Sequence, residues 1–367
     1  MPTIATADDS AATNSTWLDF LNSQHAQWNV DGTINSFGQP ELEHYLVKHG
    51  PVLANLSHQA LLKISGNDAT SFLQGQLTND LHQVTEQLAQ LSAYCDPKGQ
   101  VLAIFLIFKH QDAFYLTFEN SLKESILKRL KMFVMRADVQ ITDMANTLIQ
   151  IGYAGEFADV DIQRRLNTKV KNTYETGHID LDGMRDVLVV KVPGPYHKYA
   201  ILGPVEQIIN VWTLLKATCD VTNNSDWNLL DIAAGIPEVN SSTSGQFIAQ
   251  FLNLDKLDAI NFKKGCFPGQ EIIARVHYRG KVTKRMLRVH LEEEMPLSPG
   301  DVLTLNDSNG RNHNFDVIKA QRDIFSGTLC LAIGTLKSLD AVEGNLISQS
   351  GKAAIIEPLP YSITDDE

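Results

Sequence analysis

Short apolar runs bounded by turn residues fill the first 145 positions of the chain. These runs predict β-strands at residues 59–65, 113–118 and 139–142 and on either side of residues 96–99. Pro97 and Gly99 occupy the second and fourth positions of that four-residue link, which favours a type I turn. Helices are predicted at 68–74 and after Asn120 or Ser121. A hairpin, a helix and a returning strand indicate an α+β layer, in which helices cover one side of a sheet.

The pattern of the remaining chain changes from mixed to strand-only. Strands are predicted at 148–153, 187–192 and 199–202, with helices near 205–217 and 226–234. After Met286, short strands alternate with Gly, Ser and Asn turns, at 287–291, 302–305, 315–319 and 328–333. This last pattern predicts a small closed β domain, a β-barrel. The fold class is therefore α+β, with the α+β region over residues 15–285 and the barrel over 286–367.

Two further expectations concern the ends of the chain and its overall class. Residues 1–14 have little to bury and are expected to form a disordered tail, ahead of a helix capped by Ser15 or Thr16. A chain of 367 residues exceeds one ordinary core, so two or three domains are expected. No run approaches the roughly 20 apolar residues that span a bilayer, and the N-terminus is acidic where a signal peptide is basic. We therefore expect a cytoplasmic protein with no membrane segment.

Charge is distributed unevenly along the sequence. The formal net charge is −12, which on average repels nucleic acid. Between Asn261 and His290, however, eight basic residues accompany one acid, Glu271, a local charge of +7. The basic residues are Lys263, Lys264, Arg275, Arg279, Lys281, Lys284, Arg285 and Arg288. This concentration indicates an anionic ligand, whereas the basic run at 123–136 is interpreted as a solvated helix face.

Cysteine and histidine spacing argues against a metal centre. Cys95, Cys219, Cys266 and Cys330 lie far apart and form no C-x-x-C pair, unlike a zinc ribbon, a thioredoxin motif or a cluster site. The histidines at 110, 277 and 290 are not spaced as a ligand set, so no metal site is predicted. Any cysteine that performs chemistry is expected to do so singly.

Cys266 is the candidate for such a single functional thiol. Pro268 suits the first turn of a helix, and Glu271 meets the positive end of the helix dipole. Cys266 then lies just before a helix N-terminus, beside Lys263 and Lys264, and both features favour the reactive thiolate. The alternative is a buried, inert cysteine in the core.

The segment Lys264 to Glu271, K-G-C-F-P-G-Q-E, resembles the K-G-C-[YF]-x-G-Q-E signature of the YgfZ family. This family is related to the aminomethyltransferase (T-protein) of the glycine cleavage system. The resemblance extends over nearly the whole chain through shorter segments in the same order. These segments are residues 64–66, 74–80, 95–99, 235–237, 244–248 and 356–362.

The resemblance implies a GcvT-like ring of three domains around a folate site, with two interleaved α+β subdomains and the C-terminal barrel. It also implies that the protein binds tetrahydrofolate and supports assembly or repair of iron–sulfur enzymes, including those that thiolate tRNA. A pterin needs an aromatic or apolar slot, which Trp227 would supply, although Trp227 could equally be a core residue. The glutamate tail needs cations, for which Lys263, Lys264 and Arg275 are candidates. Within the signature, Gly265, Gln270 and Glu271 are assigned to the same site.

Two departures from the family pattern bear on activity. The T-protein has an acidic pair shortly after the hairpin turn, but residues 101–104 here are Val-Leu-Ala-Ile. Without that carboxylate the transfer lacks its acid/base partner, so glycine-cleavage activity is not expected. Relatives also carry Trp near position 59 and an acid near 233, where this chain has Gln59 and Ala233.

Two alternative functions stay open beside the iron–sulfur accessory role. One is a folate-dependent one-carbon transferase of the aminomethyltransferase type, against which the missing carboxylate counts. The other is direct tRNA binding by residues 261–290, which the overall charge of −12 makes the least favoured.

Overall fold

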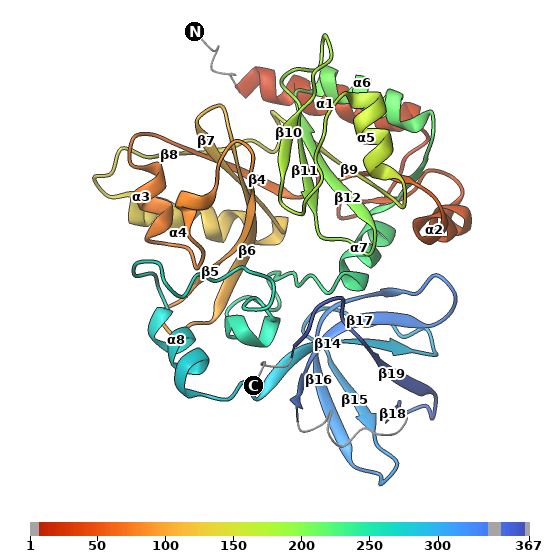
Figure 1. Ribbon diagram of the computed structural model, residues 1–367. Helices are drawn as coiled ribbons and strands as arrows, with labels where there is room; N and C mark the ends of the chain where they lie inside the picture. The colour runs from red at the N-terminus through yellow and green to blue at the C-terminus, as the bar shows by residue number, and fades with distance from the viewer. Residues whose placement is uncertain (1–6, 337–345, 364–367) are drawn as a thin grey trace.

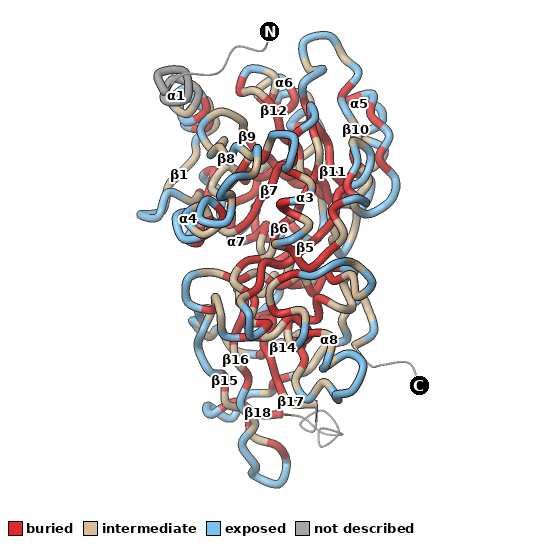
Figure 2. Tube along the Cα trace, turned by 90° about the vertical axis from the view of Figure 1, so that its left-hand side faces the viewer, coloured by how far each residue is buried: buried red, intermediate tan, exposed pale blue. Residues whose placement is uncertain are grey.

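The computed structural model describes residues 7–336 and 346–363, and these form three bodies arranged around a common centre (Figure 1). Two bodies are sheets covered by helices, and the third is a closed barrel. The predicted fold class, α+β with a C-terminal β-barrel, is confirmed. Buried residues concentrate along the strands of all three bodies (Figure 2).

The first body is an antiparallel sheet in the order β5-β6-β7-β4-β8. Its strands are β4 (Ala60–Ser65), β5 (Gln90–Cys95), β6 (Val101–His110), β7 (Ala113–Phe118) and β8 (Gln140–Asp143). Helices α3 (Ala69–Gln74) and α4 (Lys123–Val134) and the 3-10 turns η1 (Leu81–Gln83) and η2 (Asn120–Leu122) accompany it. All five strands and both helices lie where the hydrophobic pattern predicts them.

The second body contains chain from both sides of the first. Its sheet has the order β10-β11-β12-β9-β3-β13. The strands are β3 (Val52–Asn55), β9 (Ile149–Gly155), β10 (Thr176–His178), β11 (Leu188–Val192), β12 (His197–Gly203) and β13 (Asp220–Thr222). Its helices are α1 (Ala7–Ser23), α2 (Pro40–His49), α5 (Ala158–Leu166), α6 (Val205–Lys216) and α7 (Asn224–Ala233), with a small ribbon of β1 (Gln27–Trp28) and β2 (Ile34–Ser36). Because β3 pairs with β9, the chain enters the second body, leaves to build the first, and returns.

The N-terminal helix is longer than the sequence predicted. Helix α1 begins at Ala7 rather than after Ser15 or Thr16, so residues 7–14 are helical and not part of a disordered tail. Residues 1–6 of the predicted tail lie outside the described residues. Alanine has the highest helix propensity of all residues, and three of positions 7–14 are alanine. Trp17 and Leu21, one turn apart, are buried in the core of the second body and fix the helix there.

The third body is the closed barrel β14-β17-β16-β15-β18-β19. Its strands are β14 (Lys284–Leu291), β15 (Val302–Asn306), β16 (Asn312–Arg322), β17 (Thr328–Thr335), β18 (Leu346–Ile347) and β19 (Ala353–Glu357). The four predicted strands are present, and the short β18 and β19, which the pattern missed, close the ring. Leu287, Val289 and Phe315 are among the residues that fill the interior. Between the second body and the barrel the chain forms η3 (Ala249–Leu252) and α8 (Gln270–Arg279).

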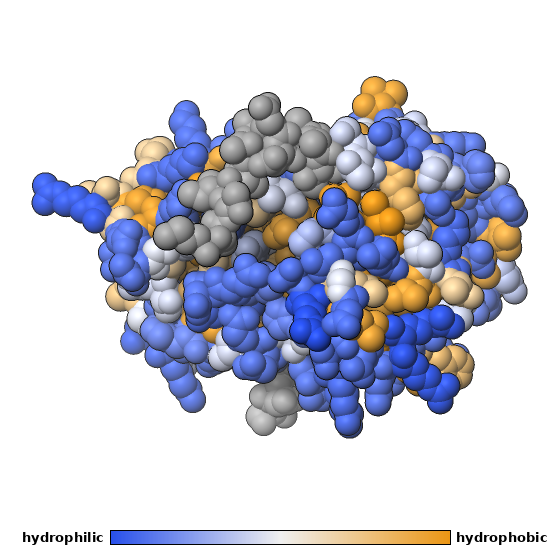
Figure 3. Space-filling model, turned by 90° about the horizontal axis from the view of Figure 1, so that it is seen from above, coloured by the Kyte–Doolittle hydropathy of each residue, from blue (hydrophilic) through white to orange (hydrophobic). Residues whose placement is uncertain are grey.

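The outer surface is largely polar. In the face shown in Figure 3, hydrophilic side chains predominate and hydrophobic ones occur in small groups between them. Among the described residues, no helix combines the length and the apolar character needed to cross a bilayer.

Candidate functional site: the central cavity and the signature loop

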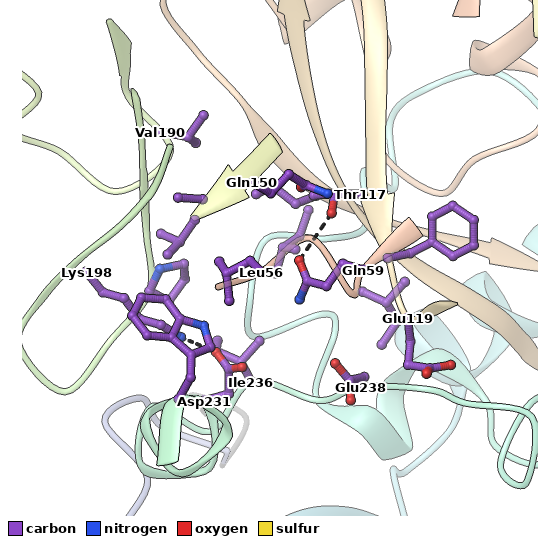
Figure 4. Close-up of a pocket in the computed structure, with 18 of the residues that line it drawn as sticks. Leu56, Gln59, Thr117, Glu119, Gln150, Val190, Lys198, Asp231, Ile236 and Glu238 are labelled. Carbon is purple, nitrogen blue, oxygen red and sulfur yellow. Dashed lines mark hydrogen bonds and ion pairs between the residues drawn. The ribbon is translucent and has the colours of Figure 1, made fainter. Parts of the chain in front are cut away.

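A cavity at the junction of the three bodies spans about 1020 Å³ of empty space, which includes open solvent at its mouth. Strands β6 and β7 of the first body form one wall, and strands β11 and β12 with helix α7 form another. The barrel contributes Lys319 from β16. Figure 4 shows side chains of β7, β12 and α7, labelled Thr117, Lys198 and Asp231, around the shared space. The site therefore exists only when all three bodies are assembled.

The wall formed by β6 is apolar. Ile104, Leu106 and Phe108 line the cavity, while Ala103, Phe105 and Ile107 are fully buried in the core of the first body on the opposite face of the strand. This division follows from the two-residue period of a strand. The wall thus offers a surface for a flat ring and no carboxylate for acid/base chemistry.

Four charged groups of alternating sign lie on the other side of the cavity. Lys198 pairs with Asp231, Asp231 also pairs with Lys319 at 3.3 Å, and Lys319 reaches Glu238 at 3.4 Å. Lys198 and Lys319 are almost completely buried. Such charges are retained in a protein interior only when they are paired. The cluster joins β12, α7 and the barrel around the cavity.

Burial and pairing act against each other in this cluster. Burial lowers the pKa of Lys198 despite the neighbouring Asp231. At Lys319 burial also lowers the pKa, but the carboxylates of Glu238 and Asp231 outweigh it and raise the value above normal. Burial raises the pKa of Asp231, and the two ammonium groups outweigh it, so the net shift is downward. The shifts therefore favour the charged forms of Asp231 and Lys319, whereas burial opposes the charged form of Lys198.

Trp227, which the sequence assigned to the site, does lie at the cavity. Its side chain is only 3% exposed, and its ring lies against the backbone of Gly152 in β9. A Cβ at position 152 would come within 2.4 Å of the ring, so only glycine fits there. The Lys198 ammonium lies 4.8 Å from the centre of the ring. Trp227 therefore packs in the core and also lines the cavity, and its contact with a pterin stays a prediction.

Helix α7 is held in place by buried polar contacts near its N-terminus. Asn223 caps the helix by accepting a hydrogen bond from the backbone N–H of Asp226 at 2.9 Å. His44 of α2 contacts the Asp226 carboxylate at 2.5 Å, and its other ring nitrogen lies 3.1 Å from the backbone carbonyl of Asp323 in the barrel. These contacts fix the two cavity residues of the helix, Trp227 and Asp231.

Carboxylates and amides line the mouth of the cavity. Gln59 accepts a hydrogen bond from Thr117 at 3.3 Å, and Glu119 and Glu238 lie nearby (Figure 4). Burial raises the pKa of Glu119, although the hydroxyl and N–H of Ser121 oppose the shift. Gln59, Glu119 and Glu238 also border an adjoining polar pocket that contains His58. At the two positions where the chain departs from its relatives, Gln59 lines the cavity and position 233 is Ala. The acid that α7 contributes to the cavity is Asp231.

The signature loop lies on the hairpin turn of the first body. Gly269 has φ +83°, and a Cβ there would come within 2.6 Å of both the Asp96 carbonyl oxygen and the Gly99 Cα. Gly99 has φ +76°, and a Cβ there would come within 3.3 Å of the side chains of Ile272 and Ile273 in α8. The signature loop and the hairpin turn are therefore in contact through Gly269 and Gly99, which are 170 positions apart in the sequence. Helix α8 begins immediately afterwards, close to the start predicted from Pro268.

Lys264 holds the same loop to the segment 74–80. Its ammonium donates hydrogen bonds to the carbonyls of Gln74 (2.7 Å), Leu77 (2.5 Å) and Asn79 (3.0 Å). Burial lowers the pKa of Lys264 to about 8, with Asp80 acting in the opposite direction. An ammonium that is already saturated by three carbonyls has no donor left for a folate carboxylate.

The remaining signature residues lie at or near the surface. Cys266 is an exposed, free thiol, and Gly265 is exposed with open space around it. Glu271 and Arg275 form an exposed ion pair of 2.6 Å within α8, and Gln270 is half-buried at the first position of the helix. None of these side chains lines the central cavity.

Lys263 occupies a different position from the other signature residues. It lines a second pocket, together with Asn79, Phe262, His277 and Tyr278. Leu91 and Tyr174 border both this pocket and the central cavity, so the two spaces share a wall. The phenyl ring of Phe262 stacks on His277 at 3.7 Å between ring centres.

Part of the positive charge between residues 261 and 290 is neutralised by the fold. Beside Lys264 and Arg275, three further cations have partners: Lys284 with Asp316 (3.3 Å), Arg285 with Asp255 (2.6 Å) and Arg288 with Glu357 (3.0 Å). The count of +7 included only the acid within the segment. Four of these five cations contact carbonyls or carboxylates that lie outside it. The local excess of positive charge is therefore smaller than the count of +7 suggested.

Sequence reasoning found Trp227 and missed the charged cluster. Lys198 and Lys319 lie in strands whose neighbours are apolar, and both are buried. A lone lysine at a core position of a strand was the available signal. Its partners, Asp231 and Glu238, come from distant segments and could not be identified without the fold.

Comparison with known proteins agrees with this architecture. The sequence model of the GCVT N-terminal domain matches residues 9–192, half of the chain. The structure is similar to the glycine cleavage system aminomethyltransferase T of Bartonella henselae, with a TM-score of 0.76, 13% sequence identity, and coverage of 93% of this chain and 96% of that one. Fold and domain match thus define a protein of the GCVT class.

A curated relative narrows the assignment. The chain is 31% identical over 311 residues to the "tRNA-modifying protein YgfZ" of Colwellia psychrerythraea, covering 85% of this chain and 93% of the relative. The chain therefore belongs to the YgfZ family.

Proposed function

We propose that this chain binds a reduced folate, such as tetrahydrofolate, in the central cavity. The observation that carries the proposal is a cavity between three domains with an apolar wall, an aromatic residue and partly buried carboxylates. The pterin ring would lie between the β6 wall and Trp227. Its ring N–H and amino groups would donate to a carboxylate at the mouth, for which Glu119 and Glu238 are available.

The glutamate tail of the folate would leave the cavity toward the second pocket. Leu91 and Tyr174 form the shared wall, and Lys263 supplies a cation on the far side. Of the three predicted tail cations, Lys264 is saturated by carbonyls and Arg275 is paired with Glu271. Lys263 is therefore the cation that this proposal uses.

Folate binding can be tested by blocking the cavity. Ala200 on β12 lines the cavity beside Lys198. The change Ala200→Phe places a ring in the space for the ligand while keeping the charged cluster. We expect calorimetric affinity for 5-formyltetrahydrofolate to fall at least about tenfold, equivalent to about 1.4 kcal/mol.

The matched control is Ile355→Phe on the exposed side of β19. It adds a similar volume outside the cavity and should leave the affinity unchanged. Unaltered binding in a folded Ala200→Phe chain would exclude the central cavity as the folate site. The Trp227→Ala change is less informative, because loss of a buried Trp costs about 3–5 kcal/mol of stability.

In the cell, we propose that the chain is a cytoplasmic accessory protein that supports assembly or repair of iron–sulfur enzymes, including those that thiolate tRNA. Membership of a family with a tRNA-modifying relative supports this role. Cys266 is the functional thiol of the proposal, because it is exposed and free at the signature loop. The cavity would supply the folate, and the thiol would act at the surface where a client enzyme can reach it.

The thiol role is tested by Cys266→Ser in cells that lack the native gene. We expect thiolated tRNA nucleosides, measured by mass spectrometry, to fall to the level of the gene deletion. Cys219→Ser, at a partly buried thiol outside the signature, is the control and should restore thiolation. Full restoration by Cys266→Ser would remove the thiol from the mechanism.

The two alternative functions receive less support. A one-carbon transfer to an amine needs a carboxylate at the reacting centre, and the β6 wall presents Ile104, Leu106 and Phe108 instead. Direct tRNA binding needs cations free to meet phosphates, and five of the eight basic residues at 261–290 already have partners. Turnover of 5,10-methylenetetrahydrofolate, or salt-dependent tRNA binding, would decide for either alternative.

A further inference from the structure

Two histidines and one glutamate meet where the first and second bodies touch, away from the central cavity. His110 ends β6, His178 ends β10, and Glu86 lies in the link between η1 and β5. One ligand atom from each side chain lies within 4.8 Å of the other two. The imidazole rings of His110 and His178 are 5.0 Å apart between centres, and His178 Nε2 lies 3.9 Å from Glu86 Oε2.

The backbone fixes all three positions. His110 pairs with Ala113 across a two-residue hairpin, whose residues Gln111 and Asp112 both have positive φ. The Glu86 carbonyl accepts a hydrogen bond from the Thr176 hydroxyl at 2.6 Å, which ties the link to β10. Only side-chain rotation is therefore needed to change the distances within the group.

His110 carries a polar atom with no partner. The residue is 7% exposed, and its Nδ1 is buried without a hydrogen bond. A buried polar nitrogen without a partner costs about 1–3 kcal/mol. A ligand that accepts the lone pair of a neutral imidazole would remove this cost.

We propose that Glu86, His110 and His178 form a binding site for a divalent transition-metal ion of the zinc type. Two imidazoles and one carboxylate suit Zn²⁺, Co²⁺, Ni²⁺ or Fe²⁺ rather than Mg²⁺ or Ca²⁺, which prefer oxygen ligands. Bonds of 2.0–2.2 Å bring tetrahedral ligands to about 3.4 Å apart. The side chains of His178 and Glu86 are 39% and 35% exposed, which leaves them room to close to that spacing.

The ion would connect the two sheets of the molecule. His110 belongs to the first sheet, His178 to the second, and the link that carries Glu86 is attached to the second. Three protein ligands leave one coordination position for water, which reaches the exposed side of the group. The site would therefore stabilise the contact between the first and second bodies.

Calorimetry with Zn²⁺ and the full-length, tag-free chain tests the proposal. A Cys266→Ser background removes the exposed thiol, which binds zinc on its own. We expect one Zn²⁺ per chain and a rise in the melting temperature on Zn²⁺ addition. His178→Ala and Glu86→Gln, at partly exposed positions that keep the fold, should each weaken binding at least about tenfold. His110→Ala should do the same if it folds, which circular dichroism checks.

The control is His82→Ala, because His82 pairs with Asp80 at 3.0 Å in a two-ligand group. Zinc affinity should be unchanged in this variant. The proposal is overturned if the Cys266→Ser chain binds no Zn²⁺, or if His178→Ala and Glu86→Gln both bind it with unchanged affinity.

Discussion

At the scale of single residues, glycines decide how the signature loop meets the rest of the molecule. Gly269 and Gly99 approach each other with positive φ, and no side chain fits between them. Gly265, four positions earlier, has open space around it. Packing therefore requires glycine at position 269 but not at position 265.

Gly269→Ala is expected to lower the free energy of unfolding by at least about 2 kcal/mol, because a Cβ adds backbone strain to a clash with Asp96 and Gly99. Urea unfolding followed by circular dichroism measures the change. Gly265→Ala, the matched control, should alter stability by less than about 0.5 kcal/mol. Equal stability of the two variants would mean that the loop is free to move away from the hairpin.

At the scale of elements, helix α7 carries two residues of the central cavity. Trp227 and Asp231 lie one turn apart and so share a face. Their placement depends on the contact between His44 of α2 and Asp226. The hydrogen bond to Asp226 raises the pKa of His44, although burial opposes the shift.

A pH dependence of stability follows from His44. Because the pKa is raised in the folded state, the stabilisation is complete below the unfolded value of about 6.5 and is lost as pH rises through the folded value. His44→Gln should therefore cost about 1.5–3 kcal/mol at pH 5.5 and less at pH 8. Urea unfolding of both chains across this range measures the difference, and a constant difference would contradict the assignment.

At the scale of the whole molecule, buried ion pairs join the barrel to the other bodies. Arg285 of β14 is fully buried and contacts Asp255 through two hydrogen bonds of 2.6 and 2.9 Å. Lys319 of β16 reaches Asp231 in the second body. Buried ion pairs as well as apolar packing therefore hold the barrel against the rest of the molecule around the central cavity.

Asp255→Asn is expected to destabilise the chain by about 3–5 kcal/mol, since it leaves the buried Arg285 charge without its counter-ion. Thermal unfolding and limited proteolysis between the barrel and the second body would report the loss. Glu271→Gln breaks the exposed pair with Arg275 and should change stability by at most about 0.5 kcal/mol. A similar small effect of Asp255→Asn would show that the barrel docks without this pair.

The sequence by itself determined most of the elements and one residue of the cavity. Strand periodicity located the hairpin at 91–118 and the barrel strands, because alternation of apolar residues depends only on local geometry. The helix at 226–234 was predicted from its pattern of apolar residues, and it contains Trp227, which lines the cavity. Helix α1 begins eight residues before the predicted start, because the helix propensity of its alanines outweighs the polar composition of residues 7–14.

The tertiary structure decided which residues share a site. Lys198, Asp231, Lys319 and Glu238 come from segments up to 121 positions apart, and no local pattern links them. Likewise, Lys264 looked like a ligand for an anion and instead binds three carbonyls. Propensity and periodicity act over a few residues, whereas desolvation and pairing of charges depend on what the fold brings near, so the former could be predicted and the latter could not.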